Sequence, residues 1–251
     1  MNILKTYTVA TQQPDTFLVY WTNSPIRPGG ILKVVVRQQV EDPQIAAELA
    51  AMQHLLEDKR VIGSNTVGSP NTRLTVSQGA IRKLQRRQSD KGHLAPYANF
   101  LTTRFSGCQL CVEKDSQWFE GLSPDATEDL NVNAPHRELI KVTGLGDVSV
   151  TQHVLDRFAD RFLADTSPSN IKRKAWKKLI ETASDPMVHE VSRPGFWNSV
   201  KYGRQNRHEG RYFLNNRSKL ILVVTDNPGE GKRLVTVYPM SKQFSPSTKQ
   251  S

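Results

Sequence analysis

Residues 42–59 read DPQIAAELAAMQHLLEDK, and this stretch determines how the first half of the chain is organised. Asp42 and Pro43 are residue types typical of the N-cap and first turn of a helix. Apolar side chains then recur at helical spacing on one face. They are Ile45, Leu49, Met52 and Leu56. The stretch therefore predicts an amphipathic helix that packs on other elements.

Strands are predicted on both sides of this helix. Residues 4–11, 16–23 and 31–40 are rich in β-branched and aromatic side chains, and turn-forming residues separate them. After the helix, residues 72–87 predict a strand that runs into a second helix, and residues 108–114 a further strand. The first half is therefore expected to be an α/β domain with a mixed sheet.

A polar, acidic and turn-rich region separates the two halves, and we expect an inter-domain linker at residues 119–147. After it, the sequence predicts two helices, followed by an antiparallel sheet joined through hairpin turns. The domains are then expected at 1–118 and 148–240, with a flexible tail at 241–251. The predicted helices cover residues 151–163 and 170–183, and the strands 188–191, 210–214, 220–225 and 233–238.

The charge of the chain favours a polyanionic partner. The formal net charge is +10 and the isoelectric point is about 9.7. Between residues 170 and 220, 12 Lys or Arg side chains stand against 4 acidic ones. A concentrated positive field is typical of proteins that bind nucleic acid.

Other features limit the class of protein. No stretch approaches the roughly 20 apolar residues of a transmembrane helix, and the first residues do not resemble a signal peptide. We therefore expect a soluble, cytoplasmic protein. Cys108 and Cys111 form a CxxC pair, which is found in zinc sites and in redox pairs. Their apolar neighbours, and the lack of a second ligand pair, favour two ordinary thiols on a strand.

The order of elements in the first half resembles ribonuclease H. The resemblance rests on the βββαβα pattern, on Glu48 in the first helix, and on Val76-Ser77-Gln78 at the end of the next strand. Ribonuclease H carries a metal-binding Asp where this chain has Val76, and its first strand bears an Asp that YTVAT (7–11) lacks. Two-metal hydrolysis needs several converging carboxylates, so this half is expected to be catalytically inactive. It is expected either to bind an RNA duplex or a partner, or to be a scaffold with Glu48 as a solvated helix carboxylate.

The helix TQHVLDRFADRF (151–162) carries a row of basic side chains. His153, Arg157 and Arg161 recur every fourth residue, beside an apolar stripe that contains Val154 and Phe158. Such a row can face a cleft, or it can be a salt-bridged surface.

Basic and aromatic residues accompany this row, a mixture that suits phosphate contact and base stacking. On the final strand, Thr236 and Tyr238 are expected to share a face because side chains alternate along a strand. The other members are Lys172, Arg173, Lys174, Lys177 and Lys178 on the second helix, and Lys201, Tyr202, Arg204, Arg207, His208, Arg211 and Tyr212 after it.

Residues 148–240 resemble endoribonuclease toxins of the barnase and RelE-like superfamily. The resemblance rests on the helix His-x-x-x-Arg, matched by His153 and Arg157, and on Val-Thr-Val-Tyr in the last strand, which contains Thr236 and Tyr238. It implies cleavage of RNA by its own 2′-hydroxyl, without metal or other cofactor. His153 would be the acid–base and Thr236 an orienting donor.

In the same reading, Arg157 and Arg211 would bind the phosphate. Further RNA-binding residues would be Arg161, Lys201, Arg204, Arg207, Tyr212 and Tyr238. The partner would be mRNA or ribosome-associated RNA, with a ribosome or an antitoxin as further partners, in a bacterial or phage setting. Two alternatives stay open: a non-catalytic protein that binds RNA or the ribosome, and a metal-dependent nuclease that uses Glu48.

Overall fold

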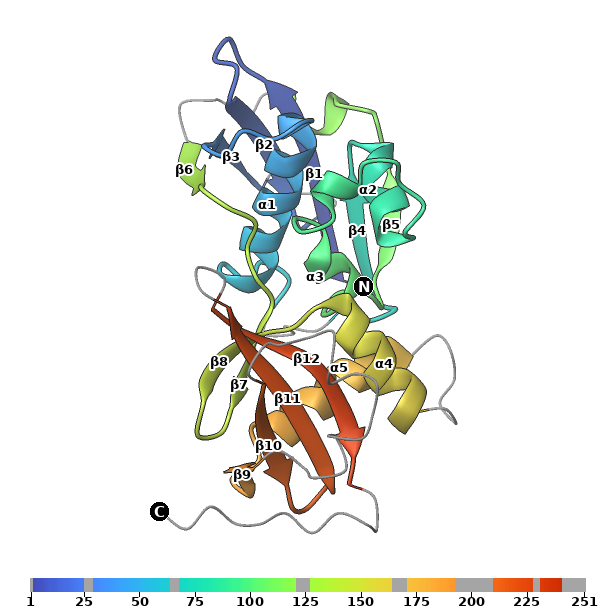
Figure 1. Cartoon of the computed structure of the whole chain (residues 1–251). Helices are drawn as coiled ribbons and strands as arrows, with labels where there is room; N and C mark the ends of the chain where they lie inside the picture. The colour runs from blue at the N-terminus through green and yellow to red at the C-terminus, as the bar shows by residue number, and fades with distance from the viewer. Residues whose placement is uncertain are drawn as a thin grey trace. The chain divides into compact units, whose positions relative to one another are not determined.

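The computed structural model describes residues 2–24, 29–63, 68–120, 127–163, 171–192, 210–227 and 231–240. The chain divides into two compact units, Met1–His136 and Arg137–Ser251. Each unit contains one six-stranded sheet with both parallel and antiparallel pairs, so the general expectation of a mixed α/β protein is confirmed. Figure 1 shows the helices that accompany each sheet.

The first sheet has the strand order β5-β4-β1-β2-β3-β6. The chain runs antiparallel through β1, β2 and β3, then β4 returns parallel to β1, and β5 parallel to β4. β6 adds to the far edge, parallel to β3. The strands are β1 (Asn2–Ala10), β2 (Thr16–Thr22), β3 (Gly30–Val36), β4 (Thr72–Val76), β5 (Gln109–Val112) and β6 (Thr127–Val132).

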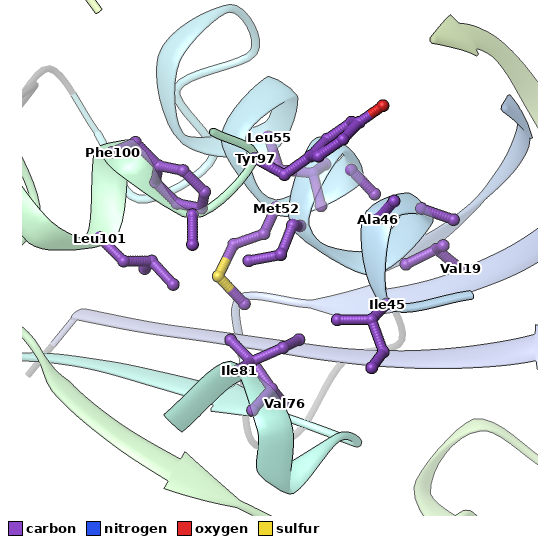
Figure 2. Packing of buried hydrophobic residues seen from close by; sticks show 14 of the residues in the cluster. Val19, Ile45, Ala46, Met52, Leu55, Val76, Ile81, Tyr97, Phe100 and Leu101 are labelled. Carbon is purple, nitrogen blue, oxygen red and sulfur yellow. The ribbon is translucent and has the colours of Figure 1, made fainter. Parts of the chain in front are cut away.

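The predicted helix at 42–59 is α1 (Pro43–Glu57), which packs across β1, β2 and β3. Its apolar face is buried, and Figure 2 shows Met52 pointing towards Phe100, Leu101 and Ile81 in the core. The remaining helices are short. They are α2 (Gly79–Gln85), α3 (Asn99–Thr102) and the 3₁₀ turns η1 (Gly92–Leu94) and η2 (Gln117–Phe119).

The start of α1 differs in detail from the expected cap. Asp42 occupies the N-cap with φ 60°, and its side chain makes no hydrogen bond to the helix. The carboxylate instead accepts a 2.6 Å hydrogen bond from Lys91 and lies 3.4 Å from His93. The Asp42 contact raises the pKa of Lys91. This residue therefore ties the helix start to the loop before η1 rather than capping α1.

The second sheet has the order β7-β8-β12-β11-β10-β9 and corrects two expectations. It is not purely antiparallel, because β8 pairs in parallel with β12. The hairpin of β7 and β8 was not predicted, and Gly144 and Gly146 adopt positive φ in it. The strands are β7 (Leu139–Val142), β8 (Gly146–Ser149), β9 (Val188–Val191), β10 (Arg211–Asn215), β11 (Leu220–Asn227) and β12 (Gly231–Pro239).

The expected linker at 119–147 is therefore wrong in large part. It contains β6, which completes the first sheet, and β7 with the start of β8, which open the second. The boundary between the units falls between His136 and Arg137. Short strands with exposed polar side chains, such as those in TEDLNV (127–132), lack the apolar alternation that marks a strand in sequence.

The two predicted helices of the second unit are α4 (Gln152–Phe162) and α5 (Ile171–Ala183), and they pack against each other. Phe158 of α4 and Trp176 of α5 are almost completely buried. The Asn215 side chain donates a 2.8 Å hydrogen bond to the Thr182 carbonyl, which fixes α5 to one face of the sheet. Within the described residues, no helix has the length and apolar character to cross a membrane.

The core of the first unit makes a stability prediction. Met52 is 0% exposed, so Met52→Ala should lower the free energy of unfolding of this unit by about 2–5 kcal/mol. Met187 of the second unit is 49% exposed, and Met187→Ala should change stability by less than about 0.5 kcal/mol. Urea denaturation of both variants checks this, and equal losses would contradict the packing of α1.

Candidate functional site

Helix α4 and strand β12 run side by side in the same direction. Ser149, just before α4, pairs with Arg233 near the start of β12, and its hydroxyl donates to the Lys232 carbonyl at 3.0 Å. Arg161, in the last turn of α4, reaches Thr236 further along the strand. Helix α4 therefore lies alongside β12 between these two anchor points (Figure 1).

A β-bulge in β12 sets the direction of the Thr236 side chain. Val224 pairs with Leu234, whereas Val223 pairs with Thr236, so Val235 is an extra residue. Directly paired side chains lie on the same face of a sheet. The bulge therefore places Thr236 on the face opposite Leu234, although two residues of regular strand would have kept them together.

The pairing gathers three of the predicted site residues on that face. Tyr212 pairs with Val223, which pairs with Thr236, so these side chains form a row across β10, β11 and β12. Tyr238 lies on the same face, two residues after Thr236. The expectation that Thr236 and Tyr238 share a face agrees with this register. We call Thr236, Tyr238 and Tyr212, together with His153, Arg157 and Arg161 of α4, the α4–β12 cluster.

Arg161 makes the direct link between helix and strand. Its Nη1 atom donates to Thr236 Oγ1 at 3.2 Å and to the Val237 carbonyl at 2.5 Å. The guanidinium carbon lies 4.5 Å from the centre of the Tyr238 ring, within the range of a cation–π contact. Arg161, predicted to bind RNA, thus already holds three groups of the protein itself.

His153 and Arg157 differ from Arg161 in having no such partners. His153 is exposed and Arg157 half-buried. In the described part of the chain, neither forms a hydrogen bond or an ion pair, so no salt-bridged row is present there. Four residues of α-helix rise about 6 Å, so His153 stands about 12 Å before Arg161 along the axis. Thr236 is nearly buried, with 5% of its surface exposed.

Arg211 does not join this cluster. It pairs with Val224, which places it on the face opposite Tyr212 and Thr236. Its guanidinium forms two hydrogen bonds to the Glu190 carboxylate, at 3.0 and 2.7 Å, and stands 5.3 Å from the centre of the Phe213 ring. Glu190 was not foreseen, since its proximity follows only from the pairing of β9 with β10.

The other predicted RNA-binding residues, Lys201, Arg204 and Arg207, lie outside the described residues, as do Tyr202 and His208. On α5, Lys174, Lys177 and Lys178 are exposed to solvent. Described basic side chains are thus available on both helices of the second unit.

A second polar centre lies in the first unit, around Glu48. The prediction of a solvated carboxylate is wrong, because Glu48 is 0% exposed. Its Oε1 accepts hydrogen bonds from the Thr6 hydroxyl at 2.9 Å and the Ser77 backbone N–H at 2.7 Å, and its Oε2 accepts one from the Ser77 hydroxyl at 2.6 Å. Thr6 lies on β1 and Ser77 directly after β4, so the carboxyl connects α1 to two adjacent strands.

The Glu48 centre is built from hydroxyl groups, not from further carboxylates. Among the described residues, no group of three His, Cys, Asp or Glu side chains could hold a metal ion. Within the described residues, Cys108 and Cys111 form no disulfide. Burial raises the pKa of the Glu48 carboxyl, and the hydrogen bonds from Ser77 and Thr6 oppose that rise.

Comparison with protein-family models, with curated proteins and with solved structures finds no match to this chain. The features that bear on its function are the α4–β12 cluster, the Glu48 centre and the charge of the two units.

The raised pKa of Glu48 makes stability depend on pH. An unfolded glutamate loses its proton near pH 4.3, whereas native Glu48 keeps it to higher pH. Above pH 4.3 the native state thus binds more protons, so the free energy of unfolding falls as pH rises towards the native pKa. Glu48→Gln, which accepts from Ser77 N–H and can donate to Ser77 Oγ, should lack this fall.

Urea denaturation of the wild type and Glu48→Gln across pH 4 to 9 measures the difference, with hydrogen exchange of β1 amides to identify the first unit. Glu128→Gln is the matched control, since Lys59 lowers the pKa of Glu128. That carboxylate is exposed, so the control should show a small effect of opposite sign. Parallel curves for wild type and Glu48→Gln would contradict a raised pKa.

Proposed function

We propose that the second unit is a metal-independent endoribonuclease that cleaves RNA by attack of the 2′-hydroxyl. One observation carries the proposal: α4 lies along β12 and contacts it through Arg161, so the helix with His153 and Arg157 neighbours the strand that presents Thr236 and Tyr238. This is the combination that the resemblance to barnase and RelE-like toxins implies. The contact of Arg161 with Thr236 supports it, because it joins the two motifs of that resemblance in space.

The residue types match the steps of the reaction. An imidazole can both accept and donate a proton, so exposed His153 is suited to take the 2′-hydroxyl proton or to protonate the leaving 5′-oxygen. Arg157 offers a planar fork for the negative phosphate oxygens, which carry more charge in the transition state. Thr236 would donate a hydrogen bond to a non-bridging oxygen. Tyr212 and Tyr238 lie on the same sheet face, where they would stack on bases.

The charge of the second unit supports an RNA substrate. Residues 137–251 contain 20 Lys and Arg against 11 Asp and Glu, whereas residues 1–136 contain 14 against 13. Nearly all of the net positive charge thus belongs to the unit with the α4–β12 cluster. We propose mRNA or ribosome-associated RNA as the substrate, with a ribosome or an antitoxin as further partners.

For the first unit we propose a ribonuclease H-like domain without catalysis. Support comes from the order β5-β4-β1-β2-β3, with β1 to β3 antiparallel and β4 and β5 parallel to β1. Glu48 lies between β1 and β4, where hydroxyl groups of Thr6 and Ser77 surround it. A lone carboxyl that burial holds towards its neutral form is poorly suited to bind two cations. The role proposed for this unit is to bind an RNA duplex or a partner.

The test is cleavage of single-stranded RNA in EDTA by wild type and His153→Ala. The wild type should cut and leave 2′,3′-cyclic phosphate ends, and His153→Ala should reduce kcat by about 10²–10⁴-fold, the usual contribution of an acid–base group. His189→Ala is the matched control, because His189 lies on β9 of the same unit and bonds the Met187 carbonyl instead.

The alternatives predict different results. A non-catalytic RNA- or ribosome-binding protein would bind RNA without cutting it, on or off ribosomes, and His153→Ala would leave its affinity unchanged. A metal-dependent nuclease would lose activity in EDTA and in Glu48→Gln. Either result would overturn the proposed mechanism.

A further inference from the structure

The hydrogen bonds of Arg161 determine the direction of the Thr236 hydroxyl proton. Guanidinium nitrogens only donate, so Thr236 Oγ1 is the acceptor in their 3.2 Å contact. Nη1 carries two hydrogens, and the second one goes to the Val237 carbonyl. Both bonds from one nitrogen to adjacent residues of β12 leave the Arg161 head group little freedom to turn away.

The Thr236 hydroxyl then retains its own hydrogen for another acceptor. None of the described residues accepts it. Because Thr236 is nearly buried, a fixed donor there acts in a medium of low dielectric constant, where it is worth more than in water. A phosphate oxygen is an acceptor of the kind that this donor fits.

Arg161 also constrains Tyr238, on the same face of the sheet as Thr236. The guanidinium carbon stands 4.5 Å from the ring centre, so the cation rests against one face of the ring. The tyrosine plane is therefore tied to the same side chain that orients the hydroxyl. Arg161 therefore orients both the Thr236 hydroxyl and the Tyr238 ring of the α4–β12 cluster.

We propose that Arg161 is a positioning residue, which acts on RNA through Thr236 and Tyr238 and does not itself bind a phosphate. The proposal rests on the proposed ribonuclease function and assigns a different role from that of Arg157, which has no partner in the described protein. A phosphate contact through Nη1 would require Arg161 to leave Thr236 and Val237.

Kinetics and binding separate these roles. Arg161→Met and Thr236→Val should each lower kcat by about 10–100-fold, the range for loss of one hydrogen bond to a charged group. The double variant should be hardly worse than either single one, because the two residues act as a unit. Arg161→Lys keeps the positive charge but not the planar donor group, so it should keep KM and lose kcat. If Arg161→Met does not fold, Arg161→Lys replaces it in the cycle.

The salt dependence of binding distinguishes the positioning role of Arg161 from a direct phosphate contact. The probe is a single-stranded oligodeoxynucleotide, which lacks the 2′-hydroxyl and cannot be cleaved by this mechanism. Loss of a direct phosphate contact would reduce the slope of log affinity against log salt by roughly 0.7–1. Arg161→Met should leave the slope unchanged, as should Lys141→Met, which removes an exposed cation from β7.

The outcomes separate this proposal from the proposed function. Additive losses in kcat, or a reduced salt slope in Arg161→Met, would overturn the positioning role while cleavage stands. A wild type that binds the oligodeoxynucleotide but cuts no RNA would overturn the enzyme. In that case, the positioning role would still be supported if the Arg161→Met and Thr236→Val double variant lost hardly more affinity for the oligodeoxynucleotide than either single variant. A wild type that neither cuts nor binds would overturn both.

Discussion

Buried polar groups need hydrogen-bond partners, and in each unit this constraint fixes a helix to the sheet. In the first unit the demanding group is the Glu48 carboxyl. Thr6 on β1 and Ser77 directly after β4 provide three donors, so a single side chain of α1 fixes that helix to the centre of the sheet. Removal of the carboxyl would leave the Ser77 hydroxyl and backbone N–H without this acceptor in a buried place, whereas the Thr6 hydroxyl also lies 3.4 Å from the Thr75 carbonyl.

In the second unit the same constraint applies to the edge of β12. β8 pairs with β12 only at Arg233, so the strand beyond that point lacks this neighbour. Arg161 supplies a donor to the Val237 carbonyl there and bonds the Thr236 hydroxyl with its other hydrogen. The interaction that satisfies the edge of the sheet therefore also brings the α4 motif to the strand motif. Fold and candidate site depend on the same side chain.

The helices and main strands could be predicted because their signals are local. Apolar spacing at 42–59, 151–163 and 170–183 marks three amphipathic helices, and all three are present. Burial of Glu48 could not be predicted, because the donors that satisfy it come from strands 29 and 42 residues away. β6 was missed because its exposed polar residues look like a linker, and β7 because its four residues form too short a run to mark a strand.

The candidate site was predictable to a similar degree. Helical spacing is enough to place His153, Arg157 and Arg161 in one row. It could not separate Arg161, which bonds β12, from Arg157, which has no described partner. The alternation of side chains along β12 could not reveal the β-bulge at Val235 either, because a bulge is defined by the register with the partner strand. The predicted role of Arg211 in phosphate binding did not foresee its ion pair, because the partner Glu190 lies on another strand.

The uneven charge of the two units constrains how the whole chain would act on RNA. With 14 cations against 13 anions, the first unit has almost no net charge to attract a polyanion at long range. The second unit, with 20 against 11, would capture RNA first through contacts that read no sequence. Any selectivity added by the first unit must then come from short-range shape and hydrogen bonding. Capture and selection would accordingly respond differently to salt, because only the first depends on counterion release.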